Sequence, residues 1–118
     1  MTQAGLEATK IKITPEEAVR ESAPQYFALE EKIKAVSPHM DIHRIRDAYE
    51  YAAKAHAGQR RKDGSAYVTH CISAADISVD MGLDEDSIVA ALLHDVIEDT
   101  PASHEAVAKQ FGETVANL

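Results

Sequence analysis

The sequence predicts an all-α fold, a helical bundle that forms one small domain. Apolar residues recur at intervals of three and four along most of the chain, which is the period of a helix with one buried face. Runs of alternating Val, Ile and Thr, which are typical of strands, are absent from the sequence. The chain has 118 residues, of which 45% are hydrophobic, so it can bury one core but not two independent ones.

The first 40 residues predict an N-terminal helical segment that packs on the rest of the domain. Thr14 precedes Pro15 and two glutamates, a pattern that is typical of a helix N-terminus, so we expect a helix to begin near residue 15. Pro24 lacks the N–H that a helix interior needs, and we expect it to interrupt or restart this helix. Helical spacing then continues over residues 26–36 and ends at Ser37-Pro38.

Residues 41–118 predict the main domain, which begins with a capped helix and a loop. Asp41 is placed to cap a helix that ends near Gly58. The predicted inward face of this helix consists of Ile42, Ile45, Tyr49, Ala52, Ala53 and His56. Residues 58–69 read GQRRKDGSAYVT, have no apolar period and contain two glycines, so we expect a loop that carries the basic cluster.

Two further helices are predicted after this loop. The first runs from His70 to Met81 and ends at Gly82, and Asp84 is placed to cap the second. Apolar residues cover nearly the whole circumference of the second helix over residues 88–97, which predicts a central, buried helix.

The last part of the chain predicts two short helices. Thr100-Pro101 ends the central helix, Ser103 can cap a short one, and a further helix starts at Glu113. Leu118 follows that start by only one or two turns, so we expect the last helix, and with it the domain, to be incomplete at the C-terminus. Apolar helix faces exposed there would favour self-association.

Charge and composition narrow the classes of partner and compartment. The net charge is −8, and residues 71–118 hold one Lys or Arg against ten Asp or Glu, so nucleic acid is not an expected partner. Arg60, Arg61 and Lys62 form a local basic cluster that suits a small anionic ligand. No apolar run approaches the ~20 residues of a membrane span, the N-terminus lacks a secretory signal, and a single Cys71 allows no internal disulfide. These features predict a cytoplasmic protein without a membrane partner.

Candidate site residues gather where the central helix ends. His94, Asp95, Glu98 and Asp99 occupy neighbouring helical rows, because residues four apart share a face. Acids at a helix C-terminus oppose the helix dipole, and a divalent cation bound by an imidazole and a carboxylate would compensate them. His70, at the start of the preceding helix, is a candidate third ligand. The alternative is a helix end that runs into solvent with its acids facing water.

Two ordered motifs resemble the hydrolase domain of the RelA/SpoT family of alarmone enzymes. That family has the pattern A-Y-x-x-A-x-x-A-H-x-G-Q-x-R-K-S-G-E-P-Y-x-x-H-P, followed by A-A-L-L-H-D-x-x-E-D-T. This chain has AYEYAAKAHAGQRRKDGSAYVTHC and, after an intervening helix, AALLHDVIEDT. The resemblance covers roughly the last 70 residues and implies the helical bundle of an HD-type phosphohydrolase.

The resemblance also implies roles for individual residues. His70, His94 and Asp95 correspond to ligands of a manganese ion, and Glu98 and Asp99 to the catalytic acids that prepare the attacking water. Residues implied in substrate binding are Arg61, Lys62, Asp63, Gly64 and Tyr67. The implied substrate is a guanine nucleotide, ppGpp or pppGpp, whose 3′-pyrophosphate is hydrolysed to give GDP or GTP and pyrophosphate.

Several departures keep two alternatives open. Asp63 stands where the family has Ser, Ser65-Ala66 replaces Glu-Pro, and Cys71 replaces the proline after the histidine. The family completes its metal site with a further aspartate downstream of the residues present here. The alternatives are an inactive regulatory or interaction module, and an HD phosphohydrolase that acts on another nucleotide. His56, within the first motif, is either a packed structural histidine or a neighbour of the substrate.

Overall fold

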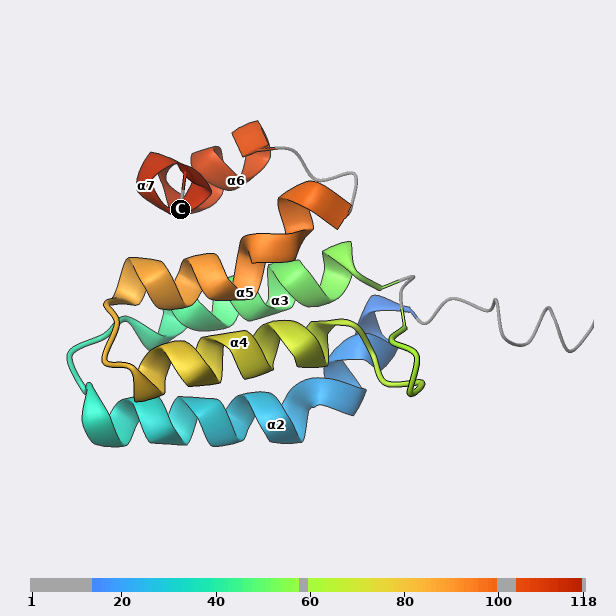
Figure 1. The fold of residues 1–118 in the computed structure, drawn as a ribbon, viewed down its shortest axis with the longest axis horizontal. Helices are drawn as coiled ribbons and strands as arrows, with labels where there is room; N and C mark the ends of the chain where they lie inside the picture. The colour runs from blue at the N-terminus through green and yellow to red at the C-terminus, as the bar shows by residue number, and fades with distance from the viewer. Residues whose placement is uncertain (1–13, 58–59, 100–103, 118) are drawn as a thin grey trace, which may run out of the picture.

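The chain folds into a bundle of helices, as the sequence predicts. The computed structural model describes residues 14–57, 60–99 and 104–117, and the side chains of residues 97–99 lie outside that description. The helices are α2 (Pro15–Val36), α3 (Ile42–Ala55), α4 (Val68–Asp80), α5 (Glu85–Asp99), α6 (His104–Phe111) and α7 (Glu113–Asn117) (Figure 1). Over the described ranges the only β-type pairing is an isolated bridge between Arg60 and Ala66. The all-α prediction is confirmed.

Helix α5 lies at the centre of the packing. It contacts α3 and α4, and α2 packs on the same two helices (Figure 1). Helices α6 and α7 contact each other, and α7 also contacts α5. The apolar side chains of α5 that are almost wholly buried are Ile88, Val89, Leu92, Leu93 and Val96. Each such side chain contributes roughly 1.5–3 kcal/mol by leaving water. The predicted central helix is therefore confirmed. Asp95 lies on the same helix, between the buried residues Leu93 and Val96.

Helix α2 passes through Pro24 without a break, so the predicted interruption is wrong. Pro24 is exposed, and buried side chains lie on both sides of it, with Ala18 and Ser22 before and Tyr26 and Leu29 after. Packing of this face on α3 and α4 outweighs the roughly 3 kcal/mol that proline costs inside a helix. The continuity of α2 therefore depends on its contacts with other helices, which cannot be seen in the local sequence.

The helix termini follow the predicted caps with one difference. The Asp41 side chain accepts the backbone N–H of Arg44, and the Asp84 side chain accepts that of Ser87. Helix α4 begins at Val68 rather than at His70, because Val68 is buried in the core and Tyr67 occupies the N-cap position. The predicted signals at Gly58, Thr100, Pro101 and Ser103 lie outside the described residues.

Within the described part of the chain, no helix combines the length and apolar character needed to cross a membrane.

Candidate metal centre

Asp95 is a carboxylate held at the edge of the core. The residue is 7% exposed, although its helix neighbour His94 points outward with a side chain that is 63% exposed. His94 Nδ1 lies 3.0 Å from Asp95 Oδ1, and His70 Nε2, from α4, lies 3.6 Å from Asp95 Oδ2. Two helices therefore bring one imidazole to each carboxylate oxygen.

Tyr67 completes the surroundings of this carboxylate. Its hydroxyl donates a hydrogen bond to Asp95 Oδ2 at 3.1 Å. The Tyr67 ring lies 4.6 Å from the His56 ring and 5.6 Å, edge-on, from the His70 ring, measured between centroids. His56 is buried, so the structure places it as a packed residue beneath Tyr67.

The donor set has the chemistry of a site for a divalent first-row metal. Imidazole and carboxylate are ligands of such ions, and a buried carboxylate needs a compensating positive charge. Among the described ion pairs, Asp95 is matched with His70 and His94 and with no Lys or Arg. Among the described residues, no group of three or more His, Cys, Asp or Glu side chains is arranged to hold a metal ion. The side-chain types of His70, His94 and Asp95 suit a divalent cation. In the described geometry they form two pairs, His70–Asp95 and His94–Asp95, that share the Asp95 carboxylate.

The basic loop forms a hollow beside Tyr67. Arg61, Lys62 and Asp63 are exposed there, and together with Arg60 and Tyr67 they line a space of about 470 Å³. Since the Tyr67 hydroxyl also contacts Asp95, the hollow and the carboxylate border the same side chain. The loop therefore presents two cations next to the candidate metal centre.

Hydrogen bonds within the loop fix its shape. Arg60 pairs with Glu21 of α2 at 3.0 Å and donates to the carbonyl of Gly64 at 2.5 Å. Asp63 accepts hydrogen bonds from the hydroxyl and the backbone N–H of Ser65, and these lower the pKa of Asp63. Gly64 has a φ of 90°, which a residue with a side chain rarely adopts. Arg60 is thus engaged in holding the loop to α2.

The predicted site residues fall into three groups. His70, His94 and Asp95 lie together, and the residues implied in substrate binding lie on the adjoining loop. Glu98 and Asp99 belong to the last turn of α5, and their side chains lie outside the described residues. The hydrogen bond from Tyr67 to Asp95 was not predicted, although the spacing of three residues between Tyr67 and His70 was a signal for it.

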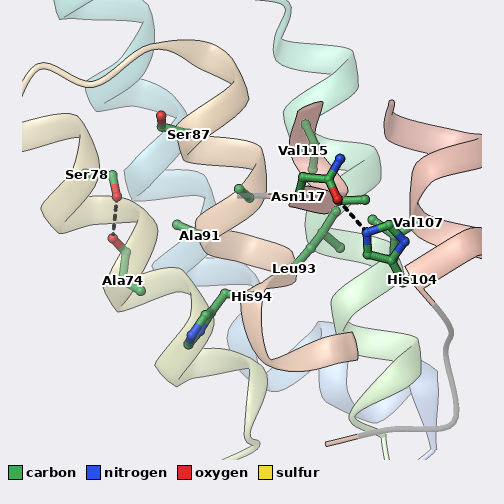
Figure 2. A pocket seen from close by; sticks show the side chains of 12 residues that line it. Ala74, Ser78, Ser87, Ala91, Leu93, His94, His104, Val107, Val115 and Asn117 are labelled. Carbon is green, nitrogen blue, oxygen red and sulfur yellow. Dashed lines mark hydrogen bonds between the residues drawn. The ribbon is translucent and has the colours of Figure 1, made fainter. Parts of the chain in front are cut away.

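A second hollow, of about 510 Å³, is lined by residues of α4, α5, α6 and α7, and His94 is one of them (Figure 2). Its lining is largely apolar, and His104 closes one side through a 2.9 Å hydrogen bond with Asn117. His39, His43 and His104 are exposed.

Comparison with known proteins identifies relatives of this helical site. The family described as "HD domain" matches residues 48–118. The chain is 45% identical over 93 residues to the bifunctional (p)ppGpp synthase/hydrolase SpoT of Escherichia coli K12, a match covering 79% of this chain and 13% of the relative. It is 40% identical over 93 residues to a guanosine-3′,5′-bis(diphosphate) 3′-pyrophosphohydrolase of Aquifex aeolicus, covering 77% and 13%.

A third relative, the GTP pyrophosphokinase of Myxococcus xanthus, is 48% identical over 81 residues, covering 69% of this chain and 11% of the relative. The chain thus spans only 11–13% of the length of these three curated relatives. The matched family begins in α3 and includes Asp95 and both of its histidines.

Proposed function

The chain belongs to the HD-domain family, and on that premise we propose that it carries the metal-binding part of a (p)ppGpp hydrolase. The proposed reaction is removal of the 3′-pyrophosphate from ppGpp or pppGpp, which gives GDP or GTP and pyrophosphate. One observation carries the proposal: the buried carboxylate of Asp95 is faced by the imidazoles of His70 and His94. The printed names of the relatives from Escherichia coli and Aquifex aeolicus support the choice of substrate.

We propose Mn²⁺ as the ion that His70, His94 and Asp95 hold. Imidazole nitrogen and carboxylate oxygen suit a divalent first-row metal. When bound, such an ion supplies a Lewis acid and lowers the pKa of a water that it coordinates. Asp95 contributes the negative charge of the site, and solvent and substrate can reach the two histidine side chains, which are 43% and 63% exposed.

The remaining roles follow from position along the chain. Arg61 and Lys62, on the rim of the hollow, neutralise phosphate oxygens of the nucleotide while water attacks the phosphorus bonded to the ribose 3′-oxygen and that oxygen leaves. Asp63 and Gly64 set the path of the loop beneath them. Glu98 and Asp99, one helical turn after His94 and Asp95, are the proposed groups that take and return protons during attack by water.

Hydrolysis of radiolabelled ppGpp by the purified chain tests this proposal. With Mn²⁺ present, we expect release of pyrophosphate and formation of GDP, and with EDTA we expect neither. Arg61→Ala with Lys62→Ala should raise the KM for ppGpp while Mn²⁺ binding stays unchanged, because these residues contact substrate and not the ion. Mn²⁺ binding without pyrophosphate release would contradict the proposed reaction, and turnover of a different nucleotide in a substrate panel would redirect it to another HD phosphohydrolase activity.

A further inference from the structure

Tyr67 lies between the two parts of the proposed site. Its hydroxyl bonds to the carboxylate of Asp95, while its side chain forms part of the wall of the basic hollow. It also stands at the N-cap of α4, one turn before His70, whose backbone N–H donates to the Tyr67 carbonyl at 3.0 Å. One residue therefore touches the carboxylate, the histidine and the substrate-side loop.

We propose that Tyr67 is a positioning residue that orients Asp95 for cation binding, in addition to any part it plays in shaping the loop. This inference rests on the proposed function, since it concerns the same metal site. The sequence resemblance places Tyr67 only among the residues of the substrate side. The structure assigns it a second role through a named bond to the metal-site carboxylate.

The geometry explains why a hydroxyl is needed at this position. Asp95 Oδ1 is matched with His94 Nδ1 at 3.0 Å, and Oδ2 faces both the Tyr67 hydroxyl at 3.1 Å and His70 Nε2 at 3.6 Å. A carboxylate on a short side chain can rotate about its last torsion. The hydroxyl of Tyr67 fixes that rotation, so each oxygen keeps its own histidine.

The hydroxyl is itself held firmly in place. His56, which is buried at the end of α3, packs against the Tyr67 ring at 4.6 Å, and His70 meets the ring edge-on at 5.6 Å. Tyr67 lies at a helix terminus whose next residue, Val68, is buried. The ring is therefore fixed from the core side, and the position of the Asp95 carboxylate is fixed through it.

Partners that orient a metal ligand tune affinity by about 10–100-fold in metal sites. Tyr67→Phe removes the hydroxyl and keeps the ring that packs on His56. We expect this substitution to weaken Mn²⁺ binding by about tenfold or more. The expected effect is on Mn²⁺ affinity, because the ring that walls the hollow is retained and only the hydroxyl that contacts Asp95 is lost.

Isothermal titration of Mn²⁺ into the full chain, its Tyr67→Phe variant and a Tyr51→Phe control tests the inference. Tyr51 is a half-buried tyrosine on α3 whose ring packs edge-on against Phe111 of α6 at 5.7 Å. The control should bind Mn²⁺ as the wild type does. Thermal unfolding of all three proteins in EDTA verifies that each is folded at the titration temperature, so that a weaker affinity reports the site.

Equal Mn²⁺ affinity in the wild type and Tyr67→Phe would overturn the inference alone. A raised KM for ppGpp with unchanged Mn²⁺ affinity would also overturn it, because Tyr67 would then act on the substrate. Failure of the wild-type chain to bind Mn²⁺ would overturn the proposed function and this inference with it. An about tenfold weaker affinity confined to Tyr67→Phe supports the assignment.

Discussion

Two buried carboxylates in this bundle have very different partners. Glu30 on α2 is 1% exposed and accepts two hydrogen bonds from the guanidinium of Arg46, at 2.7 and 2.8 Å. Asp95 on α5 is 7% exposed and receives imidazoles and a tyrosine hydroxyl instead. The first carboxylate is neutralised by a permanent cation of the chain, and the second is not.

The difference separates a structural pair from a binding site. Hydrogen bonds from Arg46 lower the pKa of Glu30, while burial opposes them, and a guanidinium stays charged at every ordinary pH. This pair joins α2 to α3. The described ion-pair partners of Asp95 are imidazoles, which are charged only when protonated, so no permanent cation of the chain occupies the place that a divalent cation would take. Partner type, and not burial alone, distinguishes the two carboxylates.

Asp95→Asn is expected to give the largest effect. Loss of the ligand charge should lower ppGpp hydrolysis by about a thousandfold or more, which corresponds to several kcal/mol of transition-state stabilisation. The free energy of unfolding in EDTA should not fall, because the amide keeps the shape and removes a buried charge. Parallel rate assays and urea unfolding measure both quantities. A large loss of stability would place Asp95 with Glu30 as a structural residue.

Glu30→Gln is expected to show the opposite pattern. Removing the negative charge weakens two charged hydrogen bonds, and because Arg46 is partly exposed we expect a loss of about 1–2 kcal/mol in the free energy of unfolding. Mn²⁺ affinity and the hydrolysis rate should stay at wild-type values. Urea unfolding together with Mn²⁺ titration tests this, and any reduction in Mn²⁺ affinity would show that the two regions are coupled.

The stability that Glu30 contributes should depend on pH in a defined window. Its folded-state pKa lies below the ordinary value of 4.5, so the unfolded chain binds more protons in the interval between the two pKa values. The contribution is therefore complete above about pH 4.5 and is lost as the pH falls through the folded-state pKa. The difference in unfolding free energy between the wild type and Glu30→Gln should shrink on acidification, as measured by urea unfolding at a series of pH values. A constant difference would rule out this linkage.

Lys32→Gln should give the smallest effect. Lys32 pairs with Asp76 and Asp80 at 2.7 and 2.5 Å, but the three side chains are 35–61% exposed to water. Pairs of this kind contribute little, and salt screens them. We expect only a slight fall in the unfolding midpoint at low salt and none at high salt. A loss of unfolding free energy as large as that of Glu30→Gln would show that the exposure of an ion pair does not determine how much it stabilises the fold.

Sequence patterns predicted the structure correctly where the local signals for a helix and the burial of its residues lead to the same result. The caps at Asp41 and Asp84 and the apolar circumference of α5 each appear in the structure as expected. Continuity through Pro24 and the start of α4 at Val68 could not be predicted, because both depend on contacts between helices that are distant in sequence.

The same limit applies to the candidate site. The motif of His94 and Asp95 could be seen in the sequence, and so could the presence of His70 on a neighbouring helix. The sequence did not show which side chain would pair with each buried acid. Arg46 for Glu30 and Tyr67 for Asp95 are set by how α2, α3, α4 and α5 lie against one another.

Titration of Mn²⁺ into the wild-type chain and into Asp95→Asn tests the central claim most directly. The account predicts one bound equivalent per wild-type chain and no measurable binding to Asp95→Asn, with Glu30→Gln binding as the wild type does. Equal binding to the wild type and Asp95→Asn, or no binding to the wild type, would contradict it.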